Sequence, residues 1–536
     1  MHRIALTTAL VALTALPLRA QDALPAWRQN GICYEIFVRS FFDSDGDGVG
    51  DLRGVIAKLD HVNDGDPATA SDLGATCIWL MPIMQSPSYH GYDVTNYYQV
   101  DRDYGTNADF RELIEQAHRR GIRVIIDLVI NHVSAEHPIF RSALLYAASP
   151  WRDWFIWSPA PRPSPGWEAP VWHDVPTRDE FYYGLFWSGM PDYNLAHAAA
   201  TAELENVARF WLEDMGADGF RMDAVGHLFE GPGGQWKHGP GVHSWLRAYG
   251  SFIRGVAPES FTIGEVWDST GAIAPYYPDQ LDSYFVFEVA DALVNAVRSG
   301  SGQGLIGAVM RAQEQLPRGR WSPFLRNHDQ RRTMAELGGD TRRAKLAATL
   351  LLTMPGFPFL YYGEELGMSG DKPDPRLRTP MHWTRERAAG FTRGMPWEPL
   401  QPDSFAANVA VQTGDSASLL SHYRRMIRLR AAAPALGATA DFVPLETGST
   451  SVIAYLRRTG DDVVLVIANL GADVVAGVSL SSTGAVLGPG RYRVRPLLGR
   501  AQATFLDVRS DGRIRRWIGL PWLEPLEGYV LELSPH

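Results

Sequence analysis

The sequence predicts an α/β fold: a (β/α)8 TIM barrel with a subdomain inserted after the third strand and a C-terminal antiparallel β-sandwich. Three observations support this fold class. Apolar strand-like runs alternate with helical stretches about eight times over some 400 residues, and right-handed βα crossovers repeated that often imply a closed parallel barrel. Polar residues follow several of these runs, at the end where a barrel carries its functional groups. Beyond residue 440 the pattern changes to short alternating runs.

Length and composition are compatible with this fold. The chain has 536 residues, of which 45% are hydrophobic and 21% charged, as is typical of a globular protein. A barrel of about 250 residues can carry sizeable insertions. The net charge of −10 and the lack of a basic run argue against a nucleic-acid partner.

The first twenty residues have the features of a secretory signal peptide. His2 and Arg3 precede the apolar run 4–16, and Leu18-Arg19-Ala20 ends in a small residue suited to cleavage. The run is too short to form a stable membrane anchor. We therefore predict a signal peptide at 1–20 and expect a secreted or periplasmic protein with no membrane attachment after cleavage.

The two cysteines, Cys33 and Cys77, both lie inside apolar strand-like runs. A disulfide framework normally uses more cysteines, placed in loops. Buried cysteines often behave as small hydrophobic residues. We therefore expect two buried thiols.

The first strand is predicted at 32–38, and an aspartate-rich loop follows it. Four aspartates in this loop are separated mainly by small residues: Asp43, Asp45, Asp47 and Asp51. Carboxylates at this spacing suit Ca²⁺, which takes six to eight oxygen ligands, and they would repel one another without a cation. An EF-hand would need an acid where Gly54 stands. We therefore predict a structural calcium loop of another kind rather than a solvated turn.

The remaining elements follow in order along the chain. Helices are predicted where apolar residues recur at helical spacing, at 110–120, 204–215 and 345–353. Strands are predicted in the apolar run after Gly74 and at 122–132, 218–223, 261–265, 285–287, 323–329 and 358–362. The stretch 133–190 is too long for a βα loop, so we predict an inserted subdomain that divides the barrel into 21–132 and 191–440. Residues 441–536 form the predicted β-sandwich.

The barrel is organised around the strand that ends at Arg221 and Asp223. Alternation along a strand places these two residues side by side on one face. A neighbouring guanidinium favours the ionised, nucleophilic form of a carboxylate, so Asp223 is the candidate nucleophile, with a strand-end salt bridge as the alternative. Similar polar residues end other predicted strands: Asp127, Asn131, His132, Glu265, His328 and Asp329. Their convergence on one mouth of the barrel favours a catalytic site.

Seven motifs stand in order along the chain. They are GYDVTNY at 91–97, DLVINH at 127–132, MPDYN at 190–194, GFRMD at 219–223, GEVW at 264–267, NHD at 327–329 and GFPFLYYGE at 356–364. Together they resemble the motifs of glycoside hydrolase family 13, the α-amylase family. The resemblance extends from Cys33 to the C-terminal β-rich region. The chain is most similar to α-amylases intermediate between the oligo-1,6-glucosidase and neopullulanase groups, although Tyr193 stands where these usually have leucine.

The resemblance implies a role for each site residue. Asp223 would be the nucleophile, Glu265 the general acid/base, and Asp329 the acid that binds the sugar ring and helps to stabilise the transition state. Five further residues would line the subsite of the reacting glucose: Tyr92, Asp93, His132, Arg221 and His328. The Ca²⁺ ligands would be Asp43, Asp45, Asp47, Asp51 and the carbonyl of Val49, with Asn131 at a second calcium near the inserted subdomain.

These roles agree with the chemistry of retaining hydrolysis, which needs one ionised and one protonated carboxyl about 5 to 5.5 Å apart. Val266 and Trp267 give Glu265 a partly apolar setting, which is expected to raise its pKa. The sequence therefore predicts a secreted, monomeric hydrolase of the α-amylase type. Its substrates would be starch and maltooligosaccharides, cleaved at α-1,4-glucosidic bonds.

Two alternatives remain at this point. Residues 378–383 and 389–392 resemble stretches of exo-acting α-glucosidases and trehalose synthases. An α-glucosidase or a transglucosylase of the trehalose synthase type, acting on maltose and short α-glucosides, would use the same covalent intermediate. The other alternative, a catalytically inactive sugar-binding protein, is disfavoured because Asp223, Glu265 and Asp329 are all present.

Overall fold

The computed structural model of the protein describes residues 24–164, 166–230, 233, 235–499 and 505–536. The predicted signal peptide at 1–20 lies outside these described residues. Within them, every helix is too short or too polar to cross a membrane.

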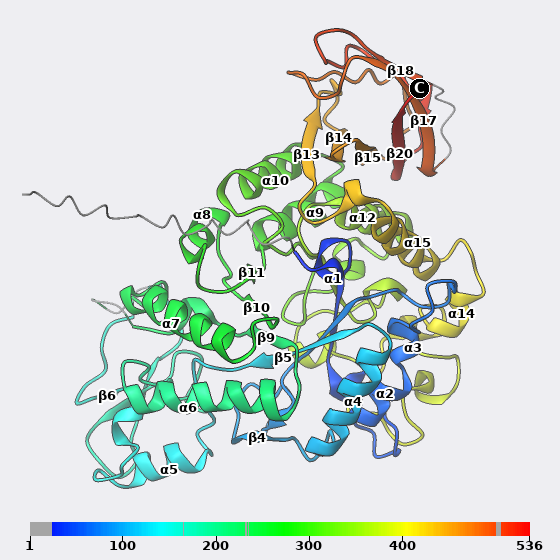
Figure 1. Cartoon of the computed structure of the whole chain (residues 1–536). Helices are drawn as coiled ribbons and strands as arrows, with labels where there is room; N and C mark the ends of the chain where they lie inside the picture. The colour runs from blue at the N-terminus through cyan, green and yellow to red at the C-terminus, as the bar shows by residue number, and fades with distance from the viewer. Residues whose placement is uncertain (1–23, 165, 231–232, 234, 500–504) are drawn as a thin grey trace, which may run out of the picture.

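A curved parallel sheet forms the centre of the molecule (Figure 1). Its strands follow the order β11-β10-β9-β5-β2-β1-β12, and each neighbouring pair is parallel. The strands are β1 (Cys33–Ile36), β2 (Cys77–Leu80), β5 (Arg123–Leu128), β9 (Gly219–Met222), β10 (Phe261–Gly264), β11 (Ser283–Tyr284) and β12 (Phe359–Tyr361). The predicted barrel is confirmed, with strands shorter than the apolar runs of the sequence.

An extended segment closes the barrel between β11 and β12, where the sequence predicts a strand at 323–329. The N–H of Ser322 donates to the carbonyl of Tyr284 (3.0 Å), and the carbonyl of Pro323 accepts from the N–H of Phe359 (3.0 Å). The predicted strand is wrong beyond this point, because proline has no N–H to give to a ladder and the chain then enters turns.

The strand predicted at 285–287 is also wrong. β11 ends at Tyr284, and Phe285 forms only an isolated parallel bridge with Ser322. Helix α9 already begins at Phe287. The apolar run is therefore shared between a strand end and the first turn of a helix.

Helices surround the sheet (Figure 1). The main ones are α2 (Leu52–Ala57), α4 (Asn107–Arg119), α6 (Ala198–Arg209), α7 (Pro240–Val256), α9 (Phe287–Ser299), α10 (Gln303–Gln315), α12 (Thr341–Thr353) and α15 (Leu419–Ala432). The helices predicted at 110–120, 204–215 and 345–353 correspond to α4, to α6 with its π-helical extension Phe210–Asp214, and to α12. Each begins earlier than predicted. For α4 and α12 the polar caps Thr106 and Asp340 set the start.

Cys33 and Cys77 form a disulfide, so the expectation of two free thiols is wrong. The two residues pair directly across the neighbouring strands β1 and β2, with their Cα atoms 4.3 Å apart. This register brings the two sulfurs together inside the barrel. The sequence alone does not reveal it, because nothing in either strand fixes which residues face each other.

The segment 133–190 has secondary structure of its own beside the barrel. It contains α5 (Pro138–Leu145) and an antiparallel sheet of β6 (Trp157–Ser158), β8 (Phe181–Tyr183) and β7 (Trp172–Asp174). The bridge between His132 and Asp192 joins its two ends to each other. In Figure 1 it lies at the end of the molecule near α6 and α7.

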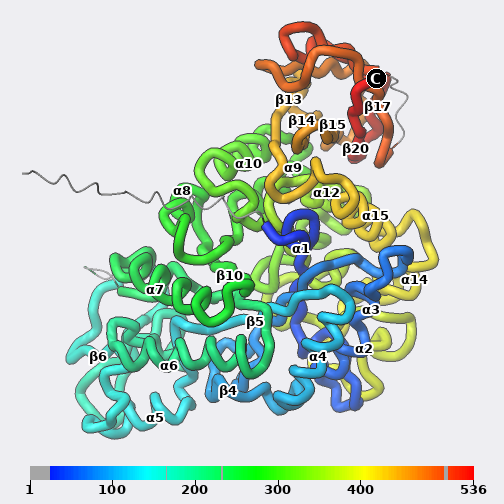
Figure 2. The backbone as a smooth tube through the Cα atoms, in the orientation of Figure 1, coloured from blue at the N-terminus to red at the C-terminus, as the bar shows by residue number. Residues whose placement is uncertain are grey.

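The C-terminal part of the chain is rich in antiparallel strands. Its main sheet has the order β13 (Asp441–Leu445), β14 (Val452–Thr459), β15 (Asp462–Asn469), β20 (Glu527–Pro535), β17 (Gly490–Leu498) and β18 (Phe505–Val508). β16 (Val475–Ala476) and β19 (Trp522–Leu523) form a second, small ladder. Figure 2 shows this domain beyond α12 and α15, at the opposite end from α5. The buried side chain of Arg457 ties it to the barrel by donating to the carbonyl of Gly437 (2.6 Å).

Candidate active site

β9 delivers the residues predicted to form the centre of the site. Arg221 is fully buried within the strand, and Asp223 follows its last residue. β10 approaches β9 so closely that a Cβ at Gly219, whose φ is +150°, would lie 1.9 Å from the carbonyl of Phe261. Glycine therefore permits this strand pairing. The pairing continues beyond the strands, because the N–H of Glu265 donates to the carbonyl of Met222, the last residue of β9 (3.1 Å). Glu265 therefore emerges beside Asp223.

One guanidinium joins three carboxyl groups. Arg221 Nη1 donates to Asp223 Oδ1 (2.8 Å) and lies 2.9 Å from both oxygens of Asp127, while Nη2 donates to Glu265 Oε2 (2.6 Å). Asp127 contacts Arg221 because the two residues face each other across β5 and β9. Both members of the predicted catalytic pair thus contact the same buried cation.

The carboxyl groups around Arg221 do not all ionise at neutral pH. Burial raises the pKa of Glu265 to about 7 against the lowering effect of Arg221, and nearby Asp223 and Asp329 add to the rise. Burial likewise raises the pKa of Asp127 to about 7. A carboxyl that titrates near neutrality can serve as a general acid.

Asp329 has the opposite electrostatic environment. Its Oδ1 accepts from Arg378 Nη2 (2.7 Å), and its Oδ2 lies 3.3 Å from His328 Nε2. Burial disfavours its charge, but His328 and Arg378 together hold the pKa of Asp329 well below its usual range. For His328 burial is also unfavourable, and the carboxylates of Asp329 and Glu35 nevertheless raise its pKa to about 10.

Tyr92 connects these two groups of side chains. Its hydroxyl donates to Asp127 Oδ2 (3.1 Å) and lies 2.7 Å from His328 Nε2. The structure therefore brings together six of the predicted site residues: Tyr92, Arg221, Asp223, Glu265, His328 and Asp329.

His132 and Asp93 lie at the edge of this group. His132 Nδ1 is 3.0 Å from Asn131 Oδ1, and its buried Nε2 finds no hydrogen-bond partner in the described part of the chain. Burial lowers the pKa of His132 to about 4, so the neutral ring can offer this nitrogen to a ligand hydroxyl. Asp93 accepts from Ser86 Oγ (2.8 Å) and also from Ser88.

The predicted calcium ligands are only partly brought together. Carboxylate oxygens of Asp43, Asp45 and Asp51 all lie within 4.8 Å of one another, and an all-oxygen donor set of this kind fits Ca²⁺. Asp47 is outside this converging group, and its side chain accepts from the N–H of Val49 (2.8 Å). Asn131 lies elsewhere, where its amide donates to the carbonyl of His227 (2.9 Å).

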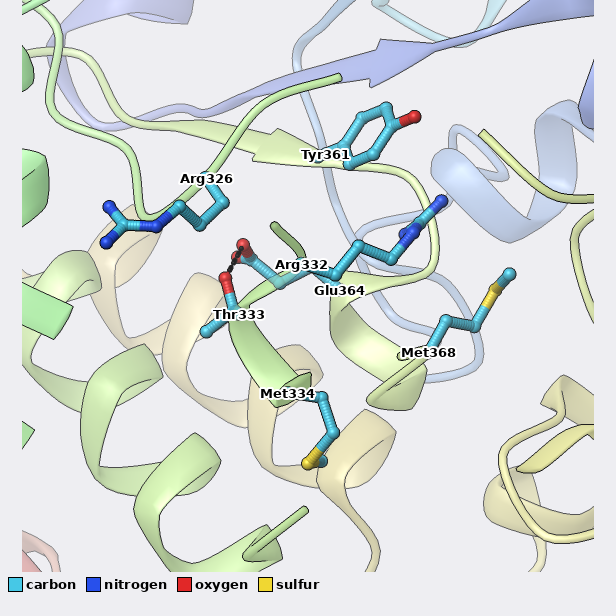
Figure 3. A pocket seen from close by; sticks show the side chains of 7 residues that line it. All are labelled: Arg326, Arg332, Thr333, Met334, Tyr361, Glu364 and Met368. Atoms are coloured by element: carbon cyan, nitrogen blue, oxygen red, sulfur yellow. Dashed lines mark hydrogen bonds between the residues drawn. The ribbon is translucent and has the colours of Figure 1, made fainter. Parts of the chain in front are cut away.

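Two cavities lie outside the carboxylate group. The smaller, of ≈ 10 Å³, is lined by Arg326, Arg332, Thr333, Met334, Tyr361, Glu364 and Met368 (Figure 3). The larger, of ≈ 540 Å³, lies between the inserted segment and the loop after β9, with Phe155, Tyr193 and Phe229 in its wall. Neither is lined by Asp223, Glu265 or Asp329, so the candidate site rests on side-chain geometry and charge.

The sequence does not assign three residues of this site. It marks Asp127 only as a strand-end acid, and the stretch containing Arg378 only by its resemblance to other enzymes. It does not place Glu35 in the site. A charged residue in the middle of an apolar strand is itself a signal, because such residues are rarely buried without a partner.

A (β/α)8 barrel with carboxyl groups gathered at the ends of its strands is an arrangement suited to cleaving glycosidic bonds. Residues 35–438 match the alpha amylase catalytic domain. The chain is 38% identical over 450 residues to Alpha-amylase 3 of Dictyoglomus thermophilum. The matched region covers 83% of this chain and 85% of that protein.

Further similarities point the same way. The trehalose synthase/amylase TreS of Mycobacterium tuberculosis is 34% identical over 511 residues, covering 84% of this chain and 83% of that protein. The crystal structure of an alpha-amylase from H. orenii matches with a TM-score of 0.82 and 37% identity, covering 94% of this chain and 99% of that one. The chain therefore belongs to the α-amylase family, glycoside hydrolase family 13.

Proposed function

We propose that the protein is a retaining α-glucan hydrolase that cleaves α-1,4-glucosidic bonds in starch and maltooligosaccharides. The observation that carries the proposal is the shared contact of Asp223 and Glu265 with Arg221. This contact places Glu265, with a pKa of about 7, beside the carboxyl of Asp223, which faces the same guanidinium. A retaining glycosidase needs such a pair.

Each carboxyl then has a separate role. Asp223 attacks the anomeric carbon while Glu265 gives its proton to the glycosidic oxygen, so that the leaving sugar departs and a glycosyl ester remains on Asp223. Glu265, now ionised, takes a proton from a water molecule, and that water displaces Asp223 with overall retention. Asp329, kept ionised by His328 and Arg378, would bind sugar hydroxyls and stabilise positive charge on the ring.

The buried histidines support sugar binding. His132 Nε2 is unpartnered among the described residues, and a hydroxyl group would satisfy it. Tyr92 stacks on His328, with ring centroids 5.7 Å apart, and could contact the apolar face of a pyranose ring.

The alternative is an enzyme that acts on maltose and short α-glucosides, either as an α-glucosidase or by transferring the glucosyl group as a trehalose synthase does. The similarity to a trehalose synthase/amylase over most of both chains supports it. Both candidates share the covalent intermediate and differ in the acceptor and in the length of substrate admitted.

A product time course separates the two candidates. Soluble starch and maltose are incubated with the enzyme, and products are followed by anomeric proton NMR. We expect early maltooligosaccharides of mixed length from starch, initially in the α configuration, with little action on maltose. Glucose or trehalose formed from maltose, with starch almost untouched, would instead assign the alternative function.

We also propose export and calcium binding. The signal-like segment 1–20 supports a secreted or periplasmic location. For calcium, the support is the convergence of Asp43, Asp45 and Asp51. This loop packs against a distant segment, since Asp43 N–H donates to Phe391 (3.0 Å) and Trp397 N–H donates to Gly48 (2.9 Å). A bound Ca²⁺ would stabilise that contact rather than take part in catalysis.

A further inference from the structure

Glu35 makes a close contact with a residue of the candidate site. It lies on β1, where the strand register sets it between Trp79 of β2 and Tyr361 of β12. Its Oε1 is 2.5 Å from His328 Nδ1, and the two side chains are 2% and 0% exposed. Among the described residues, His328 is the hydrogen-bonding partner found for this carboxylate.

The opposite edge of the His328 ring carries Nε2, and this nitrogen also faces oxygen atoms. Tyr92 donates its hydroxyl hydrogen to Asp127 Oδ2 (3.1 Å), which leaves the hydroxyl oxygen free to accept from His328 Nε2, 2.7 Å away. Nε2 also lies 3.3 Å from Asp329 Oδ2. A hydrogen on Nε2 would thus satisfy both oxygens.

Nδ1 faces an acceptor as well. Glu35 as a carboxylate has no proton to offer, and a buried carboxylate is costly unless it receives a hydrogen bond. Both nitrogens of His328 thus point at oxygen acceptors, which is the pattern expected of an imidazolium. In this form His328 places a positive charge next to Asp329, the acid whose ionisation the proposed mechanism requires.

We propose that Glu35 is a positioning residue of the active site, whose carboxylate keeps His328 charged so that His328 orients Asp329 and keeps it ionised. The raised pKa of His328, at about 10, agrees with this geometry. The kinetic consequence rests on the proposed hydrolase function, whereas the protonation of His328 can be measured without any substrate.

Several other ionisable groups also face His328 and enter the expected pH dependence. They are Tyr92 from the segment between β3 (Met84–Gln85) and β4 (Asn96–Val100), Asp127 from β5, Glu265 after β10, Asp329 on the same segment and Arg378 directly after α13 (Asp374–Leu377). All of them remain in place when Glu35 is replaced. The titration of these groups therefore affects the variant and the wild type equally, and it cancels when the two enzymes are compared at the same pH.

The test uses Glu35→Gln, which preserves shape and hydrogen bonding but removes the charge. NMR of histidine-labelled protein, with His328 assigned by comparison with His328→Gln, reports the protons on Nδ1 and Nε2. We expect both protons in the wild type up to about pH 9. In Glu35→Gln the titration of His328 should move down by about one to three pH units, the usual effect of one adjacent opposite charge.

Kinetics supply the second readout. The ratio of kcat/KM between Glu35→Gln and wild type should be close to one at about pH 6 and fall about tenfold for each pH unit above the lowered titration of His328. Glu35→Asp keeps the charge and should restore the wild-type titration. Glu365→Gln is the matched control, because Glu365 forms a similar buried pair with His61 (3.0 Å) and its hydrogen bonds do not involve the site.

Two outcomes would overturn the proposal. The first is that His328 keeps both protons up to pH 9 in Glu35→Gln, which would show that Glu35 does not set its charge. Alternatively, His328 could lose a proton in this variant while the kinetic ratio stays independent of pH, which would exclude an effect through Asp329. Failure of the wild type to cleave α-glucans would remove the proposed function but leave the NMR result intact.

Discussion

Glu265 Oε2 lies 2.6 Å from Arg221 Nη2, a contact that lowers the pKa of Glu265 without outweighing the effect of burial. The guanidinium is fully buried and shares one positive charge among Glu265, Asp223 and Asp127. If all three carboxyls were ionised, the buried group would carry a net negative charge, which is costly in a medium of low dielectric constant. A proton held near neutrality on Glu265 relieves that cost.

Activity is therefore expected to decrease at alkaline pH. The protonated form of Glu265 is the active form of a general acid, and its pKa is about 7, so kcat/KM should fall as the pH rises through 7. Glu265→Gln should remove this limb and lower kcat by about 10² to 10⁴ on maltooligosaccharides. The loss should be smaller on aryl glycosides, whose leaving groups need little protonation. Equal losses on both substrates would contradict the acid role, and Glu115→Gln, on the exposed face of α4, serves as control.

Replacing the predicted nucleophile should abolish turnover but not binding. Asp223→Asn keeps the shape of the side chain and loses the attacking charge, so kcat should fall on the order of 10³-fold or more. Calorimetry with a maltooligosaccharide should still detect binding. Asp279→Asn is a suitable control, because Asp279 pairs with Arg247 at the surface (2.7 Å). Near-normal turnover of Asp223→Asn would exclude the nucleophile assignment.

The sequence predicts the barrel well because strand ends and motifs are local features. Arg221 and Asp223 meet as expected from strand alternation, and Glu265 joins them because β10 pairs with β9. The register between neighbouring strands is harder to predict from the sequence. Nothing local indicates that Cys33 faces Cys77 across two strands.

Long-range partners explain the other differences. Glu35 is separated by 293 positions from His328, and Arg378 by 49 positions from Asp329. Neither pair follows from spacing along the chain, because tertiary folding alone brings them together. At Pro323 the sequence predicts a strand that does not fully form. The run is apolar, but proline has no N–H and cannot complete the hydrogen-bond ladder.

Calcium should stabilise the protein if the aspartate loop binds it. An ion that binds only the folded state adds about 2.7 kcal/mol when present at roughly 100 times its Kd, so added Ca²⁺ should raise the melting temperature and a chelator should lower it. Asp45→Asn should lose this response. Asp66→Asn is the matched control, since Asp66 accepts a backbone N–H two residues on (2.9 Å) just as Asp45 does (3.1 Å). A melting temperature insensitive to both calcium and chelator would argue against the site.

Glu364, beside the small cavity of Figure 3, should make the stability of the protein depend on pH. It accepts from Thr333 (2.9 Å) and Tyr423 (3.0 Å), and burial raises its pKa to about 8 from a usual 4.5. Between these two values the folded state holds a proton that the unfolded chain has released. The contribution of Glu364 to the free energy of unfolding is therefore at its maximum below about pH 4.5 and decreases as the pH rises towards 8.

Glu364→Gln removes this titration, because a neutral amide stands in for the protonated carboxyl. Melting temperatures measured between about pH 5 and 8 should therefore fall less steeply in Glu364→Gln than in the wild type. The difference should amount to a few kcal/mol at most, since one pKa unit corresponds to about 1.4 kcal/mol. The exposed Glu386→Gln should keep the wild-type slope. Identical slopes for Glu364→Gln and wild type would show that Glu364 is already ionised in the folded protein.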